Sequence, residues 1–215
     1  MTMTALVDAV LVLLLTLNFL ALGVGRIRVV INTVAAQGWL IAVLPLALAT
    51  ELGPRPFLVA LGTVALKGVF IPYMLHRAMR QARIKREMEP FLGLVPAMLL
   101  EAAVTGLALA LLPRFPMASG SQHLLLLPAA VSTAVAGMIL LTTRLKAISQ
   151  VLGYLLLENG IFIFAIQLLD AMPLLVEVGV LLDLVVTIFV VTIIVHAINR
   201  EFSSLDTRHL ATLKD

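Results

Sequence analysis

The sequence predicts an all-α integral membrane protein, a bundle of about seven transmembrane helices with its N-terminus outside and its C-terminus in the cytoplasm. Three observations predict this fold class. Hydrophobic residues make up 61% of the 215 residues and charged residues only 13%, against roughly half and a quarter in soluble proteins. Seven apolar stretches are long enough to cross a bilayer. Lys and Arg gather in every second connection between these stretches.

The predicted spans follow from length, because a helix needs about 20 mainly apolar residues to cross the hydrocarbon layer. Polar or turn-forming residues separate each stretch from the next. The ranges are 5–25, 29–49, 56–75, 91–112, 122–142, 147–169 and 173–198. The third connection is the most polar, and we expect the third helix to extend past the membrane surface before Pro90 interrupts it.

The predicted orientation follows from the positive charges. The connections at 26–28, 76–90 and 143–146 and the residues after the seventh span, 199–215, hold two, five, two and three Lys or Arg residues, so twelve lie on one side. The other side has only Arg55 and Arg114, and Lys67 lies inside a span. The positive-inside rule makes the side with twelve cytoplasmic. Orientation in a lipid bilayer therefore explains the basic residues, and nucleic-acid binding is not indicated.

We expect three regions: a four-helix membrane region at 1–121, a three-helix membrane region at 122–200 and a cytoplasmic tail at 201–215. A short similarity links the fourth and seventh spans. In each, a Thr follows a carboxylate by one helical turn, Thr105 after Glu101 and Thr187 after Asp183. Duplication of a helical module and chance similarity between two apolar sequences explain this equally well.

Four ionisable residues lie in the middle of predicted spans: Lys67, Glu101, Glu158 and Asp183. Each costs about 2.5–3.5 kcal/mol on insertion scales, so each is expected to face protein or water. One interpretation is interhelical pairing. The other is proton relay, because one cation cannot pair with three acids and a buried acid without a basic partner is expected to hold its proton. We expect Lys67 to reach a midplane carboxylate, with Glu101 favoured because their helices are sequential and antiparallel.

A polar face supports the relay interpretation around Glu158. Gln150, Tyr154 and Glu158 recur every four residues and therefore share one side of the sixth predicted helix. Asn159 adds another hydrogen-bonding group beside Glu158. Gln37 lies at a similar depth in the second helix, where it either extends a water-bearing track or packs as an interhelical amide.

Other kinds of site are not indicated. The chain has no cysteine, which excludes thiolate-bound iron–sulfur and zinc sites. No two histidines have metal-ligand spacing, and neither a phosphate-binding glycine loop nor a Ser–His–acid arrangement is present. We therefore expect no catalytic residue, no metal and no cofactor in this chain.

The segment RLKAISQVLGYLLLENGI at 144–161 resembles component E of hydrogenase-4, a membrane subunit of group 4 nickel–iron hydrogenase complexes. Residues 122–200 are also similar to subunit K of NADH:quinone oxidoreductase and to the C-type subunit of multisubunit Na⁺/H⁺ antiporters. The shared pattern is a basic turn after the first of three helices, here Arg144 and Lys146, and an acid in each of the other two, here Glu158 and Asp183. For the second acid, Glu101 and Asp183 are both candidate counterparts.

The resemblance implies a non-catalytic membrane subunit of a formate hydrogenlyase-type hydrogenase or complex I-like oxidoreductase assembly, in the cytoplasmic membrane of a bacterium or archaeon. Its carboxylates would relay protons along a lateral hydrophilic axis beside a large antiporter-like subunit. The alternative is a stand-alone small transporter or a purely structural assembly subunit. A solitary transporter is expected to show two comparable halves with broken helices. Retention of a hydrogenase or antiporter-like subunit after mild detergent extraction would favour the assembly.

The charge distribution generates a topology prediction. Because the chain has no cysteine, single Ser119→Cys and Ser203→Cys variants each offer one thiol to a membrane-impermeant maleimide. We expect labelling from opposite sides, with position 119 reacting from outside. Labelling of both from the same side would show that the predicted number of spans is wrong.

Overall fold

The computed structural model describes residues 3–49, 53–81, 91–114, 123–167 and 192. Within these ranges the chain is helical and contains no strand. The elements are α1 (Met3–Gly23), α2 (Ile27–Leu48), α3 (Pro54–Thr63), the π-helix η1 (Val64–Phe70), α4 (Ile71–Gln81), α5 (Leu94–Leu111), the 3₁₀ turn η2 (Leu112–Arg114), α7 (Leu126–Thr143) and α8 (Ala147–Gln167).

Six helices in the described ranges are long and apolar enough to cross a membrane, which confirms the first six predicted spans to within a few residues at each end. The third of them is a single rod, Pro56–Arg80, composed of most of α3, all of η1 and most of α4. The seventh predicted span, 173–198, and the tail at 201–215 lie outside the described residues. The number seven and the division into three regions therefore stay predictions.

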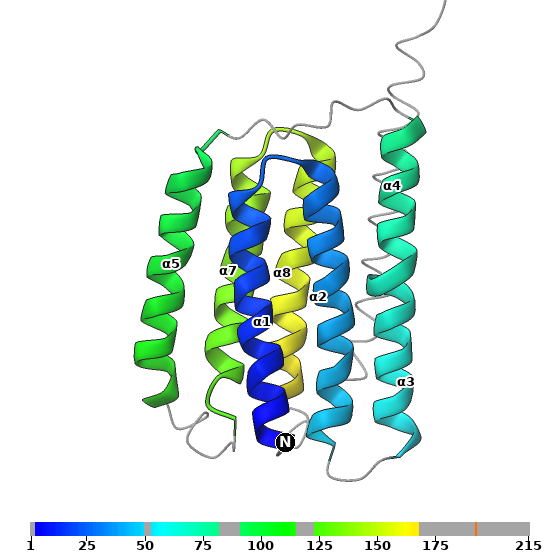
Figure 1. Ribbon diagram of the computed structural model, residues 1–215, viewed down its shortest axis with the longest axis vertical. Coiled ribbons are helices and arrows are strands. Elements are labelled where there is room, and N and C mark those ends of the chain that lie inside the picture. Colours follow the sequence, from blue (N-terminus) through cyan, green and yellow to red (C-terminus); the bar gives the residue numbers. More distant parts are fainter. Residues whose placement is uncertain (1–2, 50–52, 82–90, 115–122, 168–191, 193–215) are drawn as a thin grey trace, which may run out of the picture.

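The six helices stand side by side, with α1, α2, α7 and α8 in the middle of the bundle (Figure 1). Helix α5 stands at one edge and the α3–η1–α4 rod at the other. The α1–α2 turn, the α7–α8 turn and the last turn of α4 lie at the same end (Figure 1). We call this the basic end, because it contains Arg26, Arg28, Arg77, Arg80, Arg144 and Lys146.

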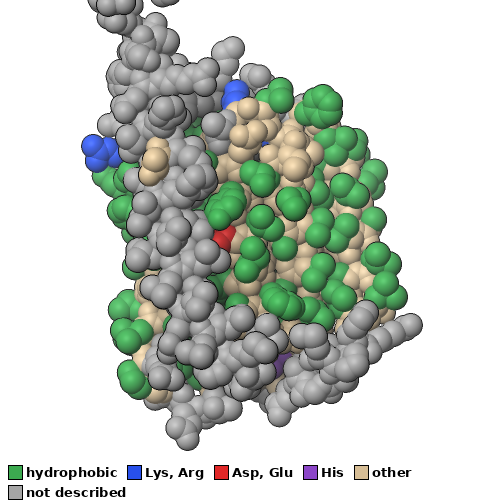
Figure 2. Space-filling view, turned by 180° about the vertical axis from the view of Figure 1, so that it is seen from behind, with side chains coloured by type: hydrophobic (Ala, Val, Ile, Leu, Met, Phe, Trp, Pro, Cys, Tyr) green, Lys and Arg blue, Asp and Glu red, His purple; other side chains and the backbone are tan. Residues whose placement is uncertain are grey.

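The surface of the bundle is that of a membrane protein. On the face in Figure 2, hydrophobic side chains cover the described helices along their length, and Lys and Arg side chains lie near one end. Because the α1–α2 turn, the α7–α8 turn and the last turn of α4 lie at the basic end, consecutive helices alternate in direction, as the charge pattern predicts. Which end faces the cytoplasm stays a prediction.

Helices α7 and α8 form the tightest pair, an antiparallel hairpin in which backbone touches backbone. A methyl group added to Gly137 would collide with the backbone of Leu157, and one added to Gly160 with that of Ala134. Gly153 makes the same kind of close approach. Small residues let membrane helices approach in this way, since lipid provides no hydrophobic force to hold them together.

The third rod contains a wide turn at η1, where the N–H of Ile71 bonds the carbonyl of Leu66, five residues back. Pro72 follows immediately; its ring would clash with the carbonyl four residues before it in a regular α-helix. A local π turn is one of the adjustments that make proline tolerable in a membrane helix. The rod also touches α2 closely, since a methyl group on Gly38 would lie 2.9 Å from the backbone of Lys67.

The hydrophobic core consists of two clusters, one above the other along the helix axes. The cluster toward the basic end contains Leu22 of α1, Val34 of α2 and Leu152 of α8. The other cluster contains Leu14 of α1 and Ile41 of α2, together with further residues of α7 and α8. Each central helix therefore contributes to both clusters, with six or seven residues, about two helical turns, from the last residue of one contribution to the first of the other.

The glycine contacts generate a stability prediction. Gly137→Ala should lower the free energy of unfolding by about 1–3 kcal/mol. The added methyl group would collide with the backbone of Leu157, which cannot move aside as a flexible side chain can. The matched control is Gly106→Ala on α5, where an added methyl group meets nothing within 4 Å. Thermal unfolding of both variants in detergent measures the difference, and equal melting temperatures would contradict it.

Candidate functional site

Buried polar side chains fill the level between the two hydrophobic clusters. On α1, for example, Asn18 lies between Leu14 of one cluster and Ala21 of the other, and on α2 Gln37 lies between Val34 and Ile41. The same arrangement recurs on α7 and α8. We call the whole set the polar layer: Asn18, Gln37, Lys67, Glu101, Thr105, Ser132, Thr133, Glu158 and Asn159, each of them buried.

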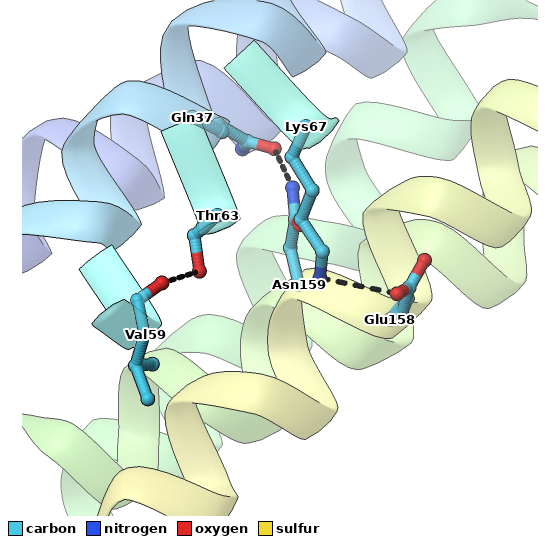
Figure 3. Close-up of polar contacts among 6 residues, drawn as sticks. All are labelled: Gln37, Val59, Thr63, Lys67, Glu158 and Asn159. Atoms are coloured by element: carbon cyan, nitrogen blue, oxygen red, sulfur yellow. Dashed lines mark hydrogen bonds and ion pairs between the residues drawn. The ribbon is translucent and has the colours of Figure 1, made fainter. Parts of the chain in front are cut away.

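The charged end of the polar layer is an ion pair between η1 and α8. The Lys67 Nζ lies 3.2 Å from the Glu158 Oε1, and the two side chains are 5% and 7% exposed (Figure 3). The ammonium also lies 5.1 Å from the centre of the Phe162 ring, an attractive contact of a cation with an aromatic face. Each charge thus offsets part of the cost of burying the other.

Side-chain amides continue the layer from α8 across the bundle. The Asn159 amide donates to the Gln37 Oε1 at 3.4 Å (Figure 3), and the Gln37 amide donates to the Asn18 Oδ1 at 2.8 Å. The Asn18 amide donates in turn to the Thr133 hydroxyl at 3.0 Å. Three consecutive hydrogen bonds therefore connect α8, α2, α1 and α7 through groups that would be costly to bury alone.

The second acid, Glu101, lies at the far end of the layer on α5. The Ser132 hydroxyl donates to its Oε1 at 2.6 Å, and the Thr105 hydroxyl donates to the same oxygen at 3.2 Å. These two hydroxyl groups are 2.7 Å apart. In the part of the chain that the structure describes, the other carboxyl oxygen, Oε2, has no hydrogen-bond partner although it is buried.

The polar layer thus extends from one edge of the bundle to the other as three groups of contacts at one level. The groups adjoin in the sequence, because Glu158 and Asn159 are neighbours on α8, and Ser132 and Thr133 are neighbours on α7. The titratable side chains lie at the two ends, with amides and hydroxyl groups between them. A hydroxyl group donates and accepts through one oxygen, whereas an amide donates from its nitrogen and accepts at its oxygen. Within the described ranges, no three His, Asp or Glu residues are placed to hold a metal ion.

The predicted pairing of Lys67 was correct about the kind of partner but wrong about the residue. Lys67 does reach a midplane carboxylate, but that carboxylate belongs to Glu158 and not to Glu101. The reason is the order of the helices in space. The rod that contains Lys67 and helix α5, which contains Glu101, are consecutive in the sequence but stand at opposite edges of the bundle (Figure 1).

Some of the polar residues that the sequence placed near the ionisable side chains belong to the polar layer, and others do not. Gln37, Asn159 and Thr105 belong to the polar layer, and Thr105 bonds the carboxylate one turn before it. Gln150 does not belong to the layer: it is exposed, and its amide donates to the carbonyl of Arg144 at 3.1 Å.

Tyr154 is half-buried and packs against the hydrophobic cluster toward the basic end. The predicted relay acid Asp183 and its neighbour Thr187 lie outside the described residues.

Three members of the layer were missed from the sequence: Asn18, Ser132 and Thr133. Asn18 had the same signal as Gln37, an amide in the middle of an apolar span. The two hydroxyl residues gave no such signal, because Ser and Thr in a membrane helix commonly bond the backbone of their own helix.

Comparison with known proteins gives two similarities. The chain is 29% identical over 191 residues to the uncharacterized protein Rv0085 of Mycobacterium tuberculosis, with 88% of this chain and 87% of that protein covered. It is also 29% identical over 101 residues to hydrogenase-4 component E of Escherichia coli K12 and of Shigella flexneri, with 47% of this chain and 46% of those proteins covered. No protein-family model and no solved structure matches the chain. Together with six apolar helices, these similarities support a distant relation to a hydrogenase membrane subunit.

The ion pair generates a prediction about coupling. Lys67→Met should destabilise the protein by about 3–5 kcal/mol, because it leaves the Glu158 charge buried without this cation. Adding Glu158→Gln to Lys67→Met should recover part of this loss, whereas adding Glu101→Gln should not. Thermal unfolding of the single and double variants measures the coupling. Simple additivity for Lys67 and Glu158 would show that they are not partners.

Proposed function

We propose that this chain is a non-catalytic membrane subunit of a hydrogenase or complex I-like assembly, and that its buried carboxylates take part in proton translocation coupled to redox chemistry elsewhere in the assembly. The observation that supports this most is the polar layer. It puts the Lys67–Glu158 pair and Glu101 at opposite ends of one buried line of polar groups that crosses the bundle.

The ion pair has the chemistry that a proton-coupled step needs. Protonation of the Glu158 carboxylate removes the negative charge that the Lys67 ammonium faces at 3.2 Å, so arrival of a proton and separation of the pair are linked. The link is strong because the Coulomb attraction between the two charges is large in a low dielectric, and protonation of the carboxylate removes it.

Glu101 has a different environment that suits proton storage. Two hydroxyl groups donate to one carboxyl oxygen, while the other is buried without a hydrogen-bond partner in the described part of the chain. A proton on that second oxygen would neutralise the carboxylate without disturbing the two existing hydrogen bonds. The acids at the two ends thus differ: Glu158 is balanced by a cation, and Glu101 by neutral donors.

The position of the layer suggests where partners would join. Its ends lie on η1 and on α5, the two edges of the described bundle (Figure 1). A large antiporter-like subunit packed against either edge would extend the line of polar groups laterally through the membrane. The distant relation to hydrogenase-4 component E supports an assembly of this kind, in the cytoplasmic membrane of a bacterium or archaeon.

A structural role is the second candidate, and one observation favours it. The amides and hydroxyl groups in the middle of the layer bond one another, which is what interhelical packing alone would require. The two candidates differ in what they demand of Glu158. Packing needs its shape and hydrogen bonds, whereas relay needs its ability to lose a proton.

Glu158→Gln separates these two roles. The amide keeps the shape of the side chain but cannot release a proton, so we expect proton pumping in reconstituted vesicles, measured per assembled complex, to fall on the order of 100-fold. Normalising to assembled complex is needed because the amide also removes the charge that faces Lys67. Glu158→Asp should retain part of the activity. The matched control is Thr16→Val on α1, an exposed polar residue near the same depth whose hydroxyl bonds only its own helix. Normal pumping by Glu158→Gln would leave Glu158 with a packing role.

A further inference from the structure

We propose that water reaches the Lys67–Glu158 pair from the basic end, by a route between α2, α4 and α8 whose mouth is formed by His76 and Asn32. Use of this route by protons rests on the proposed function, but access of water can be tested without it. Three features support the route: a cavity beside the pair, polar groups on its wall and a polar contact at its outer level.

The cavity lies on the side of Lys67 that faces the basic end. Lys67 and Asn159 provide its polar wall. The remaining wall is apolar and comes from α2, the third rod and α8: Ile31, Val34, Ile71, Pro72, Leu75 and Leu155. Its free space is about that of one water molecule. Both polar residues belong to the polar layer, so a water here would touch the candidate site directly.

A buried water requires two to four polar partners. Two polar residues, Lys67 and Asn159, line this cavity, and the rest of its wall is apolar.

The mouth of the route is a contact between α4 and α2. The His76 Nε2 lies 2.9 Å from the Asn32 Oδ1, and this pair is exposed. His76 follows Leu75 and Asn32 follows Ile31, so the contact is made next to two residues of the cavity wall. A histidine ring has two nitrogens that can take part in hydrogen bonds, which suits a group at the outer level of a water route.

The apolar wall between the mouth and the pair determines what can pass. Ile31, Val34 and Leu75 offer no polar atoms to replace the hydration shell of an ion. Single water molecules fit the space, and a hydrated sodium ion does not. The route therefore suits protons that move through transient water, with Lys67 and Asn159 as the first fixed polar groups that they meet.

Cysteine accessibility tests the route, because the chain has no cysteine of its own. The variant Leu75→Cys places a thiol on the cavity wall, and Leu152→Cys is its matched control, since both leucines are buried and only Leu75 lines the cavity. The full protein in lipid nanodiscs is treated with 2-aminoethyl methanethiosulfonate, and modification is followed by mass spectrometry. We expect Leu75→Cys to react about tenfold faster or more, because only a hydrated thiol forms its reactive thiolate readily.

Two further variants keep the test decisive. Ile31→Cys provides a second wall position in case Leu75→Cys folds poorly, and it should react as fast. Adding His76→Phe to Leu75→Cys should slow the reaction to the rate of Leu152→Cys, whereas adding His76→Gln should not. Equal rates for Leu75→Cys, Ile31→Cys and Leu152→Cys would overturn the route, and an unchanged rate with His76→Phe would overturn its mouth.

The outcome is separable from that of the proposed function, since modification requires no proton transport. Fast modification with normal pumping by Glu158→Gln would support the water route and reject the relay. Slow modification with loss of pumping by Glu158→Gln would reject the route and leave the relay supported.

Discussion

The contact between Lys67 and Glu158 constrains the rest of the bundle. A charge buried alone in hydrocarbon is costly, so the third rod must lie within side-chain reach of α8 and the two side chains must share one depth. The amides and hydroxyl groups obey the same requirement in weaker form, since each must find its hydrogen bond within protein. A single polar level with hydrophobic clusters on both sides satisfies all of these demands together.

The sequence was sufficient for the features that depend on one helix at a time. Span length follows from the thickness of the bilayer, and the depth of a residue follows from its position within its span. Six predicted spans are therefore present, and Lys67, Glu101 and Glu158 all belong to the polar layer. The alternation of helix directions followed from the positions of Lys and Arg in the same way.

Features that depend on which helices are neighbours were not accessible from the sequence. Lys67 was assigned to Glu101 from order along the chain, but packing order placed α8 and not α5 beside the third rod. The hydroxyl residues show the same limit. Thr16 bonds the backbone of its own helix, whereas Ser132 bonds a carboxylate on another helix, and only the neighbouring side chain distinguishes them. Gln150 had the correct spacing for the polar track but lies too near the surface.

The backbone contact of α7 with α8 has a mechanical consequence. Where glycines bring two main chains together, neither helix can rotate or slide without collision, so the hairpin acts as a fixed frame. Glu158 and Ser132 stand on this frame, one facing Lys67 and the other facing Glu101. Among the described residues, no glycine brings α5 or the third rod into backbone contact with this hairpin, although the third rod closely approaches α2 at Gly38. A displacement that accompanies a change of charge is therefore expected in the helices around the hairpin, with the hairpin itself as the fixed part of the bundle.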